Sequence, residues 1–331
     1  MPRSARSVLG GARRRARVGL LAAAGLTLAA PVERVARRSA ARAGVALVYH
    51  RVGDPPGDFS RELLPALGSR LFVEQVRYLN ERYRLCPASR LPEAASERRV
   101  GEPFPVAITF DDDLRSHLDI AGRILARAGA PATFFLTGAS LHGPHRFWWE
   151  RLQEARDRGI DVTPLGIAGP RADVHELGRA IESLPPRRLQ KVDAALRRLV
   201  RPDPVDAGLR AEHVAALVAD GFEIGFHTRR HHRLPGLAAA ELDAAMVEGR
   251  AELEAAAGAT LTTIAYPHGR ADERVAAAAR AAAFAAGFTG APGPVTPASD
   301  ALLLCRVSPS YTSVGELAFD VALAVRSAVS R

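Results

Sequence analysis

The chain has 331 residues, of which 47% are hydrophobic and 24% charged, as in ordinary globular proteins. This length allows one large α/β domain or two smaller ones. The formal net charge is +9, but residues 1–42 carry ten arginines and a single acid, Glu33, so this segment holds the whole excess. A nucleic-acid-binding domain carries its basic patch on its folded part, so the neutral remainder argues against a nucleic-acid partner.

Residues 1–42 have the composition of a targeting or anchor segment. Arginines precede an apolar run over residues 18–30, which fits the core of a signal peptide and is short for a transmembrane helix. Basic residues resume at Arg34, which also suits an uncleaved anchor on a membrane surface. A third interpretation is an arginine-rich amphipathic helix of a cytoplasmic protein. We favour export or membrane association.

Residues 43–331 are expected to form the folded body. It begins with a predicted strand over residues 44–50, which ends at His50. Apolar residues at helical spacing follow over residues 72–80 and predict a helix.

The next predicted strand, residues 106–110, ends in three acids. Its β-forming residues follow Pro105 and predict a buried strand, which leads into Asp111, Asp112 and Asp113. Adjacent carboxylates repel one another, and a bound cation offsets that repulsion most simply. An acidic turn that caps the following helix is the alternative interpretation of this stretch taken alone.

A helical insertion is predicted after the next two elements. A helix over residues 116–128 and a buried strand over 132–137 complete a strand–helix–strand unit, which requires parallel strands. Residues from about 141 to 209 break this rhythm with helical stretches and a turn-rich link. Trp148 and Trp149 lie there. Aromatic rings stack on sugars, but we favour a role in packing the insertion against the barrel.

Two further predicted strands end in histidines. Residues 222–232 run from a strand into a loop with His227 and His231, and residues 261–269 run from a strand into a turn that contains His268. The carboxyl ends of parallel strands collect at one edge, so these groups are expected near the acids. One carboxylate and two neutral imidazoles suit zinc and leave positions open for water and substrate.

The remaining elements complete the pattern of a barrel. Residues 241–257 predict one long helix, and residues 272–285 predict another before a short strand at 288–289. A last strand is expected over residues 302–307 and a closing amphipathic helix over 314–329. Alternating strands and helices in these numbers suit an incomplete (β/α) barrel.

The three strand-end stretches resemble the motifs of the polysaccharide deacetylases of carbohydrate esterase family 4. The Thr-Phe-Asp-Asp-Gly motif matches residues 109–113, with Asp113 in place of the glycine. The His-Ser/Thr-x-x-His motif matches residues 227–231 fully. The third motif ends in Pro-aromatic-Gly and here reads Tyr-Pro-His-Gly at residues 266–269, with Ala265 where an arginine is common. The resemblance covers roughly residues 45 to 307 and implies the family's incomplete barrel.

The resemblance also implies roles for these residues. Asp112, His227 and His231 would bind a divalent metal ion, zinc above all. Asp111 would be the general base, and a backbone N–H near His268 would help to hold the oxyanion.

The general acid is expected to be His50. An amine leaves poorly unless it is protonated, and the family usually supplies a histidine near the C-terminus for this step. The last histidine of this chain is His268, so no histidine follows the third motif. The chain is similar to circularly permuted family members in which the strand bearing this histidine comes first. The alternative is a buried histidine that hydrogen-bonds the next strand.

Two positions depart from the family pattern. Arg306, on the predicted last strand, is expected to pair with Asp111 in place of the arginine missing at Ala265. Asp113 stands where glycine permits a positive φ, although aspartate tolerates the left-handed region better than most residues. Its charge would either raise metal affinity or obstruct the sugar.

The favoured function is therefore a metal-dependent hydrolase that removes N-acetyl groups from an N-acetylhexosamine-containing polysaccharide or oligosaccharide of the cell envelope. An enzyme alternative removes O-acetyl groups from a glycan with the same residues. A non-catalytic barrel that binds glycan or serves as a scaffold is the third hypothesis. The complete set of acids and histidines argues against this third hypothesis.

Overall fold

The computed structural model describes residues 25–169 and 171–329. Its centre is a sheet of seven parallel strands in the order β1-β5-β6-β7-β8-β9, with β4 also paired to β5. The strands are β1 (Val45–Tyr49), β4 (Arg84–Leu85), β5 (Pro105–Asp111), β6 (Thr133–Leu136), β7 (Glu223–Phe226), β8 (Thr263–Ala265) and β9 (Ala286–Phe288), and the short β2 (Val52–Gly53) pairs with β3 (Leu67–Gly68). The six strands from β1 to β9 in this order form a parallel half-barrel, and β4 lies off their path. This half-barrel confirms the predicted incomplete (β/α) barrel.

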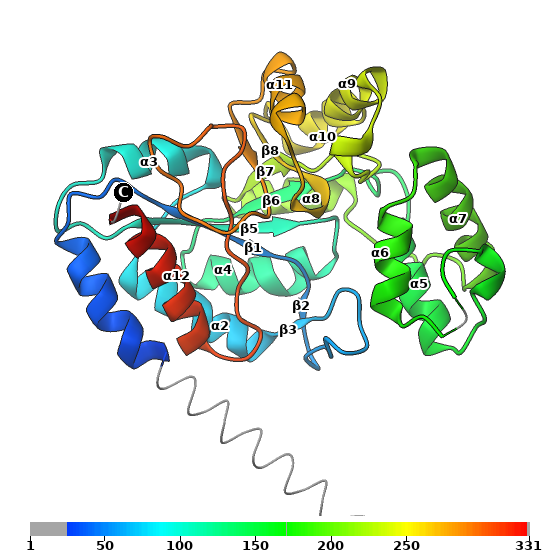
Figure 1. Ribbon diagram of the computed structural model, residues 1–331, viewed down its shortest axis with the longest axis horizontal. Helices are drawn as coiled ribbons and strands as arrows, with labels where there is room; N and C mark the ends of the chain where they lie inside the picture. The colour runs from blue at the N-terminus through cyan, green and yellow to red at the C-terminus, as the bar shows by residue number, and fades with distance from the viewer. Residues whose placement is uncertain (1–24, 170, 330–331) are drawn as a thin grey trace, which may run out of the picture.

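Helices surround the sheet, and a group of three forms a separate cluster at one end of the molecule (Figure 1). The helices are α2 (Ser69–Arg82), α3 (Leu91–Glu97), α4 (Arg123–Arg127), α5 (Trp148–Asp157), α6 (Val174–Glu182), α7 (Pro186–Leu199), α8 (Ala211–Ala219), α9 (Ala239–Val247), α10 (Arg250–Ala257), α11 (Glu273–Ala281) and α12 (Val314–Val329). The single helix predicted over 241–257 is wrong. The chain breaks between α9 and α10 at Gly249, whose φ of +77° lies outside the helical region.

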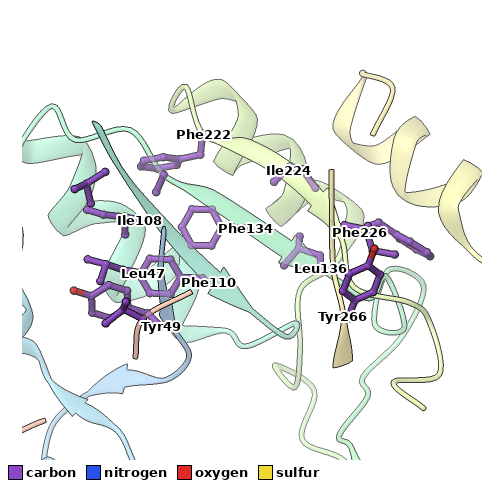
Figure 2. Close-up of a cluster of buried hydrophobic side chains, with 14 of the residues drawn as sticks. Leu47, Tyr49, Ile108, Phe110, Phe134, Leu136, Phe222, Ile224, Phe226 and Tyr266 are labelled. Atoms are coloured by element: carbon purple, nitrogen blue, oxygen red, sulfur yellow. The ribbon is translucent and has the colours of Figure 1, made fainter. Parts of the chain in front are cut away.

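The two faces of the sheet carry different side chains, because successive residues of a strand point to opposite sides. The face toward the helices carries large side chains, many of them aromatic, with Tyr49, Phe110 and Phe134 at its centre (Figure 2). The inner face is built from small residues such as Ala107, together with a few larger side chains. At Gly225 a Cβ would lie 2.4 Å from the ring of Phe135, so the inner face has no room for a side chain there.

An irregular segment over residues 302–307 closes the barrel. The regular strand predicted over residues 302–307 is wrong, since the segment makes only single bridges, Leu304 with Phe288 and Val307 with Leu47. It exchanges hydrogen bonds first with β9 and then with β1, so a continuous ladder with either strand cannot form. The segment nevertheless lies between β1 and β9, as expected for the last position of the barrel.

The region predicted as an insertion, about residues 141–209, contains α5, α6 and α7 between β6 and α8. These helices share a small hydrophobic core of their own, which includes Trp148 and Trp149. The fully buried guanidinium of Arg151 bonds Asp193 at 2.7 Å and Asp203 at 2.6 Å, so it fixes α5 against α7 and the loop that follows α7.

A helix over residues 25–37 packs against the outside of the barrel beside α12 (Figure 1). Buried Glu33 accepts hydrogen bonds from the hydroxyls of Tyr78 and Tyr83. The Arg98 guanidinium donates to the carbonyls of residues 37, 39 and 41. Residues 25–37 therefore contact the folded body directly, whereas the sequence analysis assigned them to a separate segment. No helix among the described residues is long and apolar enough to cross a membrane.

These contacts predict that Glu33→Ala lowers the free energy of unfolding by about 1–3 kcal/mol, since the hydroxyls of buried Tyr83 and half-buried Tyr78 lose their acceptor. Arg34→Ala, an exposed change on the same helix, should stay within about 0.5 kcal/mol of the parent. Urea unfolding of both variants measures the difference. Equal stabilities would show that the helix contributes little to the folded body.

Candidate metal centre and catalytic cavity

Three buried side chains, Asp112, His227 and His231, meet at the carboxyl edge of the sheet. One potential ligand atom from each lies within 4.8 Å of the others. The His231 Nε2 atom is 3.4 Å and the His227 Nε2 atom 3.7 Å from the same carboxylate oxygen of Asp112. The predicted ligand set is therefore assembled in space.

The ends of two strands set this geometry. His227 follows β7 directly, and its Nδ1 atom lies 2.8 Å from the Ala265 carbonyl at the end of β8. This hydrogen bond places the proton on Nδ1 and leaves Nε2 free as a ligand. Asp112 has a φ of +75° and His231 a φ of +49°, both in the left-handed region that few side chains adopt. These backbone conformations direct both side chains toward the same point at the carboxyl edge of the sheet.

The electrostatics of the three residues fit a cation. The Asp112 oxygen nearest the imidazoles is buried and has no hydrogen-bond partner among the described residues. Burial first, and then the charges of Asp111 and Asp113, raise the pKa of Asp112 well above its usual value. Burial also lowers the pKa of both His227 and His231, which keeps them neutral and able to ligate. Asp112, His227 and His231 would hold a divalent metal ion, which would satisfy the unpaired oxygen and the two Nε2 atoms.

Arg306 forms a buried bidentate ion pair with Asp111. Two guanidinium nitrogens of Arg306 lie 2.7 Å from the two carboxylate oxygens of Asp111, and its Nε donates to the Thr289 carbonyl at 3.0 Å. Burial raises the pKa of Asp111, but the charge and hydrogen bonds of Arg306, together with the charges of His227 and His50, lower the value to about 2. The predicted contact is thus present, and Ala265, at the position of the family's arginine, is buried on the inner face.

All the predicted site residues border one cavity of about 490 Å³. They are His50, Asp111, Asp112, His227, His231, His268 and Arg306. Burial lowers the pKa of His50 to about 4. The His268 ring lies 4.5 Å from the His231 ring, and its Nδ1 is 3.6 Å from a carboxylate oxygen of Glu182.

The insertion supplies a wall of this cavity, which the sequence analysis missed. Trp148, Trp149, His175 and Glu182 all border it, although the sequence favoured a packing role for the tryptophans. The tryptophans have both roles, because they also belong to the core of the insertion. The tryptophan pair was the one sequence signal for this wall, since the rest depends on how the insertion is placed over the sheet.

His117 lies beside the end of β5 and contacts its backbone. Its Nε2 donates to the backbone carbonyl of Asp111 at 2.9 Å, and its ring packs against Phe110 and Phe134. It begins a π-helical turn, His117–Gly122, which often marks functional positions. His117 therefore holds the backbone at the point where the chain leaves β5.

Asp113 has a structural role that the sequence did not predict. Its carboxylate accepts from the Thr137 backbone N–H at 2.7 Å, the Thr137 hydroxyl at 2.7 Å and the Ser140 hydroxyl at 3.1 Å. These bonds join the end of β5 to the loop after β6. The positive φ lies one residue earlier, at Asp112, so no glycine is required at position 113.

The chain belongs to the polysaccharide deacetylase family. The family model matches residues 99–167 and 187–287, which together are half of the chain and contain the acids and the three metal-site residues. A search of curated proteins found no significant sequence match.

Solved structures share the fold at low sequence identity. The Streptococcus pyogenes deacetylase PplD, solved in complex with acetate, is 17% identical with a TM-score of 0.59, and the match covers 84% of this chain and 98% of that one. IcaB from Ammonifex degensii is 20% identical with a TM-score of 0.56, covering 84% and 97%. BC0361, a polysaccharide deacetylase from Bacillus cereus, is 18% identical with a TM-score of 0.57, covering 84% and 69%.

The ion pair predicts a large effect on stability. At pH 7 and with a chelator present, Arg306→Leu should lower the free energy of unfolding by about 3–5 kcal/mol, because the buried charge of Asp111 is left unpaired. The double variant Arg306→Leu/Asp111→Leu should recover most of that loss. Arg230→Leu breaks the exposed pair with Glu248 and should cost less than about 1 kcal/mol. Urea unfolding compares the four proteins, and a double variant no more stable than Arg306→Leu would contradict this account.

Proposed function

We propose that the chain is a metal-dependent hydrolase that removes N-acetyl groups from an N-acetylhexosamine-containing glycan. The observation that carries the proposal is the meeting of the Asp112, His227 and His231 site with the Asp111–Arg306 pair in one cavity. A divalent ion held there, such as zinc, would polarise the acetyl carbonyl and lower the pKa of a water molecule beside it. Acetate, the expected product, is the molecule bound to the S. pyogenes deacetylase.

Asp111 is the proposed general base. Its low pKa keeps it ionised near neutrality, so it can accept a proton from the attacking water. Arg306 holds both oxygens in one plane and fixes the direction from which the proton arrives. The backbone N–H near His268 is the proposed donor to the oxyanion.

His50 is the proposed general acid, as expected for a permuted family member. It follows β1 and borders the cavity together with Asp111. Its lowered pKa makes it a strong acid once protonated, and negative charge that develops on the substrate raises the pKa and favours that protonation. Residues 1–42 are proposed, on composition alone, to direct the protein out of the cytoplasm or to a membrane surface.

A screen for acetate release tests the proposal most directly. It would compare chitin oligomers, poly-N-acetylglucosamine, peptidoglycan fragments and acetylxylan, with and without a chelator. Release from the first three that the chelator abolishes is the expected result. Release from acetylxylan alone would identify an O-acetyl esterase, and no release from any would favour a non-catalytic barrel.

Variants of Asp111 and Asp112 should distinguish the proposed general base from the proposed metal ligand. Asp111→Asn should keep bound metal but lose about 10²–10⁴-fold in kcat, because an amide accepts no proton at neutral pH. Asp112→Ala and His227→Ala should lose the metal itself, whereas His142→Ala, an exposed histidine, should change neither property. Elemental analysis and acetate release measure the two effects, and near-normal turnover by Asp111→Asn would overturn the assignment.

His50→Ala should distinguish leaving groups. Without the acid, kcat for acetamides should fall by about 10²–10⁴-fold, while an activated ester should be hydrolysed nearly as before because its alkoxide leaves without a proton. Metal content should be unchanged. Equal losses on both substrates would assign His50 a structural role.

A further inference from the structure

The rim of the catalytic cavity is built from the loop between β2 and β3, from α6 and from the segment after Val307. Leu63 and Leu64 of the loop border the cavity together with Gly178 of α6. The contact is close, since a Cβ at Gly178 would lie 2.7 Å from a methyl group of Leu63. The loop is also tied to α5, because Leu63 donates its N–H to Gln153 at 3.0 Å. This loop is therefore a fixed part of the rim.

Phe59 of the same loop is an exposed aromatic residue. Its relative exposure is 54%, whereas every other aromatic side chain in the described part of the chain is buried or half-buried. A single exposed apolar residue is common on proteins and does not by itself mark a site. Phe59 differs from such residues in two ways. Other side chains hold it in place, and its loop forms part of the cavity rim.

Two contacts fix Phe59 beside the cavity. Its ring packs edge-on against Tyr311, with ring centres 4.6 Å apart and planes at 89°. Tyr311 is half-buried and packs against the main core, so it is a firm support. The Phe59 carbonyl accepts a hydrogen bond of 2.8 Å from His175, which itself borders the cavity. The ring is thus held in place and open to solvent.

We propose that Phe59 forms a stacking subsite for a second sugar unit of a glycan whose acetylated unit lies in the metal cavity. Sugars present apolar C–H faces, which pack on aromatic rings. The subsite implies that the substrate is an oligosaccharide or polysaccharide and that the chain runs out of the cavity over this ring. The inference rests on the proposed deacetylase function, but it concerns glycan binding.

The test uses the full-length, zinc-loaded protein with N-acetylglucosamine and its β-1,4-linked pentamer. Phe59→Ala should lower kcat/KM for the pentamer by about 2- to 12-fold, the range that aromatic stacking supports, and leave the monomer unchanged. Phe59→Trp should retain pentamer activity. Val205→Ala, which trims an apolar residue with 85% exposure, is the matched control and should have no effect.

Calorimetric binding of the pentamer provides a readout without turnover. Weaker binding to Phe59→Ala than to the parent, with Phe59→Trp restored, supports the subsite even if no acetate is released, and in that case only the deacetylase proposal fails. Equal changes for monomer and pentamer, no change for either, or no pentamer binding by the parent overturns the subsite. Because the side chain is exposed, its truncation is expected to leave folding intact, and a thermal melt checks this.

Discussion

The repulsion among three consecutive buried carboxylates at the end of β5 is the constraint that the site resolves. Asp111 is neutralised by the guanidinium of Arg306. Asp113 is satisfied by hydrogen bonds from Thr137 and Ser140. Asp112 alone keeps an unpaired oxygen, and it faces two neutral imidazoles. Three identical side chains thus differ by environment, and only the middle one is left for a cation.

The strand-end motifs made the centre of the site predictable from sequence. Acids after one strand and histidines after two others must meet once the strands run parallel, and they do. His50, which the family resemblance singled out, lies at the same edge because β1 is also parallel. Local sequence could not predict those features of the backbone that are set by tertiary contacts. The helix break at Gly249 and the irregular segment through Val307 depend on neighbours far away in the chain.

The cavity wall that the insertion supplies was harder to predict than the residues at the strand ends. Strand ends are placed by a repeating geometry, whereas α5 is placed by individual contacts with the loops after β1 and β2, such as those of Arg51 with Glu150 and of Leu63 with Gln153. The tryptophans serve both the insertion core and the cavity, so neither of the simple alternatives described them fully. Family motifs define the common chemistry, and the insertion and the Phe59 rim are where this chain can differ in the glycans it accepts.

The irregular closing segment also links the order of synthesis to the chemistry. The proposed base lies in β5, but its cationic partner is 195 residues later in the chain, beyond all three metal-site residues. A growing chain can therefore present the complete ligand set while Asp111 still lacks its counter-charge. The base acquires its low pKa only when the last segment inserts between β9 and β1 and closes the barrel. Closure of the barrel and ionisation of the proposed base thus depend on the same ion pair.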